Sequence, residues 1–187
     1  SAPFEIDEKR IPNVPLADVL KHMESQHMPT KPAINQFNTM VVNTGSKLVL
    51  IDSGFNNNGQ PTTGRLAANL AAAGIDPKTI DMVLISHFHP DHINGLRSKE
   101  GELVYPQAEI VVPPGDFAHY MDEAKMNAVP EAARGAFKTA ARVFGPIAKD
   151  ITQSGWTKEW APGITAIQSD GHTPGHTSFV VSSGSKT

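Results

Sequence analysis

The stretch IDMVLISHFHPDH at residues 80–92 carries a mostly apolar run that leads directly into three histidines and an aspartate. The run at residues 80–86 is typical of a strand that is covered on both faces. Residues two apart in an extended segment point the same way, so His87 and His89 can hold one ion together. The stretch therefore predicts a layered α/β protein with a metal site just beyond the end of a buried strand.

Pro90 forces a change of direction directly after these two histidines. Asp91 and His92 then lie at the start of the next turn or helix, where they face a point beside the first ion. Imidazole and carboxylate are the ligands that a catalytic zinc ion prefers where thiolates are absent, and the chain contains no cysteine. A surface loop that happens to be rich in histidine is the alternative interpretation. The preceding strand and a second histidine cluster both disfavour it.

The second cluster is DGHTPGHT at residues 170–177. Its glycines and its proline predict a tight loop between two strands, which holds a histidine in a fixed place. One histidine from this loop would complete the ligand set begun by His87 and His89. The spacing alone leaves both His172 and His176 open as that ligand.

Hydrophobic patterning predicts strands that alternate with helices, which favours a layered α/β arrangement. The predicted strands cover residues 40–43, 47–51, 80–86, 109–112, 164–167 and 178–181, and the predicted helices cover residues 16–25, 65–73, 116–126 and 130–144. Thr62 or Thr63 is expected to cap the second of these helices. Residues 1–35 are punctuated by prolines and are expected to form an arm or flap, while residues 36–187 form the domain that carries the site.

The composition is that of a globular protein rather than a disordered one, with 39% apolar and 19% charged residues. The 187 residues suffice for one domain with a sizeable core. A net charge of −3 and scattered lysines and arginines predict no nucleic-acid partner. No apolar run approaches the roughly 20 residues that span a bilayer, so no membrane partner is expected. The chain opens without a signal-peptide pattern, which leaves a periplasmic, secreted or cytoplasmic location open.

The motif HxHxDH followed by GHTPGHT makes the chain resemble the metallo-β-lactamase-fold superfamily. The likeness spans about residues 37–187 and is closest to the branch that contains methyl parathion hydrolase. It is carried by the stretches NTGSKLVLIDSG, GRLAANLAAAG, ISHFHPDHINGL and SDGHTPGHTSFVV. The resemblance implies an αβ/βα sandwich of two β-sheets flanked by helices, with a dinuclear metal site at one edge. It also suggests a homodimer that acts on a small-molecule substrate.

The resemblance assigns the first of two divalent ions to three histidines, His87, His89 and His172. It assigns the second ion to Asp91 and His92, which are also the residues expected to act in catalysis. The ions are expected to be zinc, with iron, manganese and cobalt as alternatives.

Two further residues are expected to support the ligands without contacting a metal. His176 takes this role once His172 is assigned to the first ion. Asp52, at the end of a predicted strand, resembles the buried aspartate that braces the metal loop in the family. A polar residue that merely terminates the strand explains Asp52 equally well.

Family members carry two more ligands after this point, an aspartate that bridges both metals and a final histidine. The sequence after His176 contains no histidine, aspartate or glutamate. We therefore expect the chain to be a fragment whose domain is incomplete at its C-terminal end. The parent protein is expected to be an enzyme, whereas a fragment without the bridging carboxylate is expected to be inactive.

The predicted ligands and the resemblance together indicate a hydrolase in which a metal-bound hydroxide attacks a small ester, lactone or organophosphate. A glyoxalase-type thioester hydrolase and an iron persulfide dioxygenase are alternatives on the same fold, and the identity and number of the metals would separate them. A non-catalytic metal-binding module is the alternative from a different class, which metal uptake without hydrolysis would support.

Overall fold

The computed structural model describes residues 3–187, which form two compact units that divide after Phe37. The first unit contains helix α1 (Leu16–Ser25), as the sequence predicted. A pair of backbone hydrogen bonds of 2.9 Å between Phe4 and Ala33 closes this unit. Within the described part of the chain, none of the helices combines the length and the apolar character that a bilayer span requires.

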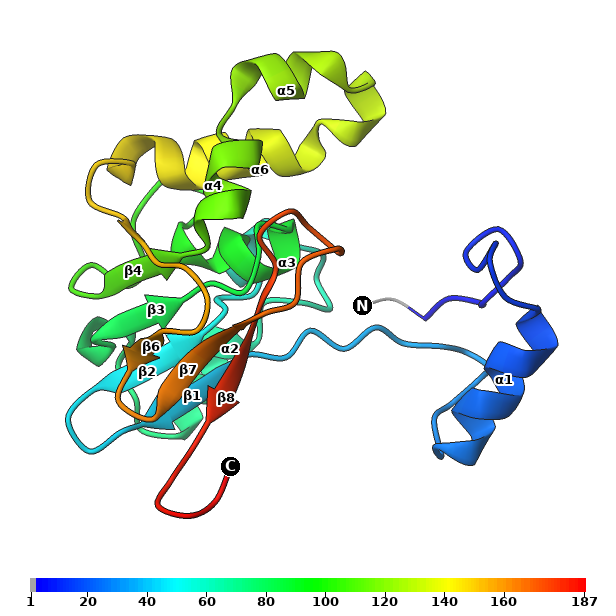
Figure 1. Ribbon diagram of the computed structural model, residues 1–187, viewed down its shortest axis with the longest axis horizontal. Coiled ribbons are helices and arrows are strands. Elements are labelled where there is room, and N and C mark those ends of the chain that lie inside the picture. The colour runs from blue at the N-terminus through cyan, green and yellow to red at the C-terminus, as the bar shows by residue number, and fades with distance from the viewer. Residues whose placement is uncertain (1–2) are drawn as a thin grey trace. The chain divides into compact units, whose positions relative to one another are not determined.

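The second unit contains two β-sheets (Figure 1). The first sheet has five strands in sequence order, β1 (Met40–Asn43), β2 (Leu48–Ile51), β3 (Met82–Leu84), β4 (Glu109–Val112) and β5 (Thr152–Gln153). Strands β1 and β2, both predicted from the sequence, form an antiparallel hairpin, whereas β2 to β5 run parallel to one another. The second sheet is an antiparallel meander of β6 (Glu159–Ala161), β7 (Ile164–Gln168) and β8 (Thr177–Val181).

The two sheets pack face to face because alternate residues of each strand are apolar and buried. Val49 and Leu84 of the first sheet lie in one cluster with Ile164 and Ala166 of the second. All four side chains are fully buried. Burying a side chain the size of valine or leucine contributes roughly 1.5–3 kcal/mol each, so this interface holds the two sheets in a fixed relation.

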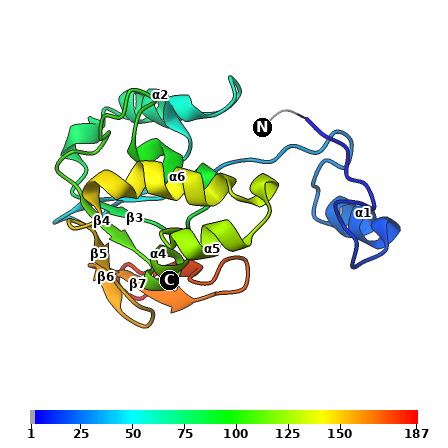
Figure 2. The same cartoon turned by 90° about the horizontal axis from the view of Figure 1, so that it is seen from above.

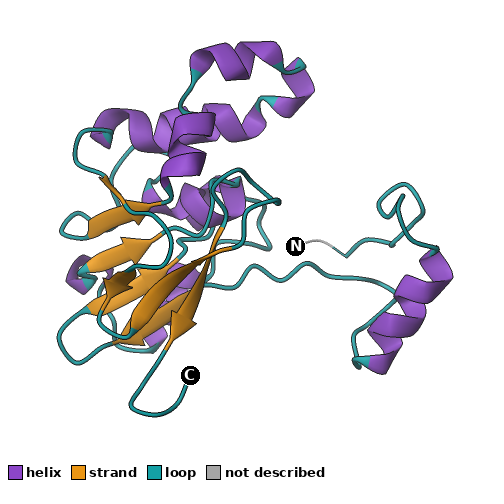
Figure 3. Ribbon diagram, in the orientation of Figure 1, coloured by secondary structure: helices purple, strands orange, loops and turns teal. Residues whose placement is uncertain are grey.

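Helices cover the other face of the first sheet (Figures 2 and 3). Leu50 and Val83 point to that face and cluster with Leu70 of one helix and Val143 of another. The α-helices of this unit are α2 (Leu66–Ala72), α3 (Pro90–Ile93), α4 (Pro114–Tyr120), α5 (Glu123–Ala128) and α6 (Gly135–Phe144). Short 3-10 turns lie at Asn56–Asn58, Pro77–Thr79, Asn94–Leu96, Glu131–Ala133 and Gly145–Ile147. The first sheet thus packs on helices with one face and on the second sheet with the other. This arrangement confirms the predicted metallo-β-lactamase-type α/β sandwich.

The end of the strand predicted at residues 80–86 and the predicted cap of α2 differ from the structure for local reasons. The strand predicted at residues 80–86 ends at Leu84, because the Ser86 N–H donates to the Asp52 side chain instead of to a neighbouring strand. The threonine cap of α2 is wrong. The Thr63 hydroxyl donates to the carbonyl of Gln60, and no side chain caps this helix.

The helices predicted at residues 116–126 and 130–144 are each interrupted. The first is divided into α4 and α5 because Asp122 caps α5, accepting hydrogen bonds from the backbone of Ala124 and Lys125 at 2.8 and 3.2 Å. The second begins only at Gly135, after a 3-10 turn. Strands β5 and β6 lie between residues 145 and 163, where no element was predicted, and they are too short to leave a hydrophobic pattern.

Candidate metal centre

Three neighbouring strands of the first sheet end beside one another, and a polar side chain follows each of them closely. Asp52 follows β2, His87 follows β3 and Asp116 follows β4. Because β2, β3 and β4 are parallel, these ends meet at one edge of the sheet. The loop between β7 and β8 reaches the same edge, since the Thr177 N–H donates to the Ser86 carbonyl at 2.9 Å.

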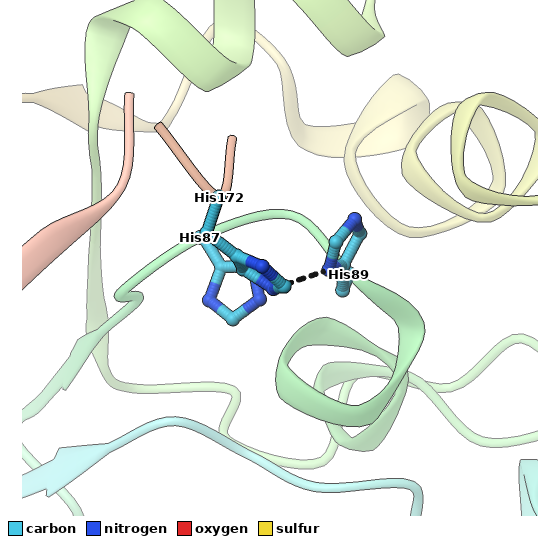
Figure 4. Close-up of side chains that lie close together, drawn as sticks. All are labelled: His87, His89 and His172. Carbon is cyan, nitrogen blue, oxygen red and sulfur yellow. Dashed lines mark hydrogen bonds between the residues drawn. The ribbon is translucent and has the colours of Figure 1, made fainter. Parts of the chain in front are cut away.

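Three of the predicted ligands, His87, His89 and His172, lie together at this edge (Figure 4). Each offers a ring nitrogen, and these nitrogens all lie within 4.8 Å of one another. The closest pair, His89 Nδ1 and His172 Nε2, is 3.0 Å apart although the two residues are separated by 83 positions in the sequence. The fold therefore brings the two histidine clusters to a common point.

His87 is the most buried of the three, with 3% of its surface exposed. Burial, followed by the neighbouring imidazoles of His92 and His89, lowers the pKa of His87 to about 2. The ring is therefore neutral, yet its Nε2 finds no hydrogen-bond partner among the described residues. Leaving such a buried polar atom unpaired costs about 1–3 kcal/mol, so the protein maintains an unpartnered nitrogen at the centre of the cluster.

The hydroxyl of Ser86 determines which nitrogen of His87 carries the proton. Ser86 Oγ lies 2.7 Å from Asp52 Oδ2 and 3.0 Å from His87 Nδ1. A carboxylate only accepts hydrogen bonds, so the hydroxyl donates its one proton to Asp52 and accepts a hydrogen bond from His87 Nδ1. The lone pair is then left on Nε2, which is the tautomer that a metal ligand requires.

Asp91 and His92 lie on the short helix α3, beside the three histidines. His92 Nδ1 is 2.8 Å from Asp52 Oδ2, and His92 Nε2 is 3.1 Å from Asp91 Oδ2. Although burial lowers it, the hydrogen bonds to Asp52 and Asp91 raise the pKa of His92 to about 9. A positive charge is therefore stable between two carboxylates here. Because a metal displaces the proton of its ligand, the same donors suit a divalent cation.

His176, the other histidine that the spacing left open, lies outside this group of three. Its ring centroid is 4.8 Å from that of His87, and its Nδ1 is 2.8 Å from Ser169 Oγ. Burial and then the imidazole of His172 lower its pKa. The structure therefore places His172, and not His176, in the group with His87 and His89.

Two residues of the site were not singled out from the sequence. Ser86 contacts Asp52 and His87 as described above. Asp116 accepts hydrogen bonds from the backbone of both histidine segments, at Phe88 and Gly175. A usable signal did exist, because Ser86 is the last residue of a predicted strand and Asp116 follows the end of another, as Asp52 does.

The donor set fits a divalent metal ion. Three imidazoles converge within 4.8 Å, and one of them is buried with an unpartnered nitrogen. Three histidines with an open position form one of the ligand sets of catalytic zinc. A carboxylate and a fourth imidazole, Asp91 and His92, lie directly beside them. Histidines on a solvated surface need no supporting hydrogen bonds like those that Ser86 makes with His87 and Asp52 makes with His92.

The sequence profile of the metallo-beta-lactamase superfamily matches residues 35–187. Among solved structures, the chain is similar to AidC, a dizinc quorum-quenching lactonase in complex with a product. The identity is 25% and the TM-score 0.85, over 98% of this chain and 65% of that one. It is also similar to the hydrolase AbOPH in the beta lactamase superfamily, with 26% identity and a TM-score of 0.79, over 91% of this chain and 60% of that one.

A structure from Staphylococcus aureus has the same fold, with 22% identity and a TM-score of 0.71 over 97% of this chain and 65% of that one. The chain thus spans 60–65% of the length of these three proteins. No curated protein matches the sequence.

Proposed function

The chain belongs to the metallo-beta-lactamase superfamily, and from this premise we propose that the protein is a metal-dependent hydrolase that cleaves small esters, lactones or organophosphates. The observation that carries the proposal is the meeting of three imidazoles around the buried, unpartnered Nε2 of His87. Histidines that only pack in the core or face solvent gain nothing from converging in this way, whereas a metal ion would bind all three ring nitrogens.

We assign the first ion to His87, His89 and His172, whose ring nitrogens already lie together. We assign a second ion to Asp91 and His92, which form the adjacent charged pair. When bound, zinc supplies a Lewis acid for the substrate oxygen and makes water acidic enough to act as a nucleophile near neutral pH.

The protein's own part is to keep these donors in the state and place that the reaction needs. Ser86 holds the proton of His87 on Nδ1, away from the metal side. Asp52 accepts from Ser86 and from His92 at once, at 2.7 and 2.8 Å. This orients a ligand of each proposed ion through one carboxylate. Asp52 is therefore proposed to brace the site, and the interpretation of Asp52 as a simple strand terminator loses its support.

The substrate class rests on the similar proteins. AidC is a lactonase and AbOPH a hydrolase, and a lactone is a cyclic ester whose carbonyl carbon is open to attack by hydroxide. We further propose that the chain belongs near methyl parathion hydrolase within the superfamily, on the stretches NTGSKLVLIDSG, GRLAANLAAAG, ISHFHPDHINGL and SDGHTPGHTSFVV. Zinc is the proposed metal because imidazole and carboxylate suit it where cysteine is absent.

The experiment begins with metal uptake, measured by zinc titration against a chromogenic chelator. His172→Ala is expected to lose tight uptake, while His176→Ala, four positions along the same loop, keeps most of it. His22→Ala on α1 serves as the control for a histidine with no part in the site. Equal affinity in the His172→Ala variant and the wild type would overturn the ligand assignment.

The second step tests hydrolysis by the full-length gene product loaded with zinc. Lactone, aryl ester and phosphotriester substrates are supplied in parallel, and turnover is compared before and after chelation. We expect chelator-sensitive turnover of at least one of these classes. Tight metal uptake with no turnover of any of them would instead support the non-catalytic module.

A further inference from the structure

Asp116 is a fully buried carboxylate at the start of α4, and its side chain is 0% exposed. An aspartate is rarely buried so completely unless both oxygens are satisfied. Here Oδ2 accepts from the Phe88 N–H at 2.8 Å, and Oδ1 accepts from the Gly175 N–H at 2.6 Å. Both donors come from outside its own helix.

The two donors lie within the two histidine segments. Phe88 stands between His87 and His89, and Gly175 stands between His172 and His176. They are joined to Asp116 across 28 and 59 positions of sequence. One carboxylate therefore links the backbones of both segments, at Phe88 between two of the proposed ligands and at Gly175 in the loop of the third.

Backbone packing reinforces this link. A Cβ atom at Gly175 would lie 2.4 Å from the backbone nitrogen of Asp116, and one at Gly115 would lie 2.9 Å from the Cα of Gly175. These are closer approaches than real Cβ atoms show. The second loop therefore contacts the first turn of α4 so closely that only glycine fits on either side.

We propose that Asp116 is a positioning residue that sets the separation between the two ligand segments, and so the geometry of the first metal site. The inference rests on the proposed function, since it concerns the same three histidines. Asp116 does not itself belong to the nitrogen cluster. It acts through Phe88, a direct neighbour of two proposed ligands, and through Gly175, which lies three positions after His172 in the same loop.

Only a carboxylate fills this role at this position. Each of its oxygens accepts from one N–H, so both backbone donors are satisfied. An asparagine has the same shape, but its NH2 group would face one of the two N–H donors, so one contact becomes unfavourable. Asp116→Asn thus releases one of the two segments while leaving volume and burial almost unchanged.

The test is zinc titration of the wild-type chain and of Asp116→Asn, with the cobalt(II) spectrum recorded as a measure of ligand geometry. We expect Asp116→Asn to weaken zinc affinity about 10- to 100-fold, as is usual for partners that orient metal ligands, and to change the cobalt spectrum. Val143→Ala in α6 is the matched control. It lowers stability by opening a cavity in the core without removing either hydrogen bond of Asp116, and its affinity and spectrum are expected to remain those of the wild type.

Wild-type affinity and an unchanged spectrum in folded Asp116→Asn would overturn the inference, as would an equal loss in Val143→Ala. If Asp116→Asn does not fold, Gly175→Ala takes its place, because the added methyl group displaces the second loop while the carboxylate stays. Unchanged affinity in that variant would again overturn the inference. A wild-type chain that binds no metal would overturn the proposed function itself, which is a distinguishable result.

Discussion

The two histidine segments reach the same point but are held there by different means. The first, residues 86–92, continues from the interior strand β3, and its Phe88 is fully buried against Phe144 at a ring distance of 4.5 Å. Half of the residues of the second, 169–176, are exposed, and only Thr173 and Gly175 are buried. Its position depends on a few backbone hydrogen bonds, such as that from Gly175 to Asp116. The first segment is thus positioned by packing and the second by individual polar contacts.

This difference has a consequence for substitutions. Substitutions in the first segment are expected to reduce stability and metal binding together, because this segment contributes both core side chains and proposed ligands. Damage to the contacts of the second segment is expected to reduce metal binding with less effect on stability. Four predictions follow this contrast from the largest expected change to the smallest.

Phe88→Ala is expected to lower the free energy of unfolding by about 3–5 kcal/mol, the usual range for truncating a buried phenylalanine. Phe88 stacks between Phe144 and Tyr120 and stands between two proposed ligands. Chemical denaturation measures the loss, and zinc titration of the folded fraction should show weaker binding. A variant that loses this stability while binding zinc as the wild type does would contradict the coupling of packing and ligand position.

Gly95→Ala is expected to lower the free energy of unfolding by about 3 kcal/mol, at the upper end of the range for overpacking. A Cβ atom there would lie 1.9 Å from the carbonyl oxygen of Ser53, so the turn after α3 must move away from the Asp52 turn. Gly155→Ala is the matched control, because no atom lies within 4 Å of its added Cβ. Thermal and chemical denaturation of the two variants gives the comparison. Equal free energies of unfolding for Gly95→Ala and Gly155→Ala would contradict this prediction, because they would show that the turn moves at no energetic cost.

Zinc is expected to stabilise the folded chain, because only the folded chain offers the assembled site. At a free zinc concentration of about 100 times the dissociation constant, removing the metal should lower the free energy of unfolding by about 2.7 kcal/mol. The measurement is the melting temperature with zinc and then with a chelator. His87→Ala should melt at one temperature in both conditions. A chelator effect that persists in this variant would place the stabilising ion elsewhere.

Ser86→Ala is expected to lower the free energy of unfolding by only about 1 kcal/mol, the usual net contribution of one hydrogen bond. Asp52 keeps its contacts with the Ser86 N–H and with His92, so the brace survives in part. Zinc affinity is expected to fall about 10-fold, because His87 is then free to adopt the other tautomer. Ser86→Thr keeps the hydroxyl and should bind more tightly than Ser86→Ala. Indistinguishable zinc affinities in the two variants would show that the hydroxyl does not set the tautomer.

Much of the fold could be predicted from the sequence because it is encoded locally. The strand that leads into His87 and the hairpin before Asp52 each carry a hydrophobic pattern or turn signal of their own. Helix α1 was predicted with the bounds that the structure shows. The short strands β5 and β6 could not be predicted, because they are strands only by virtue of partners far along the chain.

The features of the site likewise divide into those that the local sequence encodes and those that depend on distant contacts. The spacing of the histidines and aspartate in residues 87–92 fixes how these side chains can share an ion, since neighbouring positions are bound to one another by the covalent chain. The place of His172 beside His89, which the spacing left open and the family resemblance suggested, and the hydrogen bonds of Asp116 follow from contacts that span 28 to 83 positions. Such contacts depend on how two sheets and a helix pack together, and only the tertiary structure decides them, because no short-range pattern records which distant backbone will come within hydrogen-bonding distance.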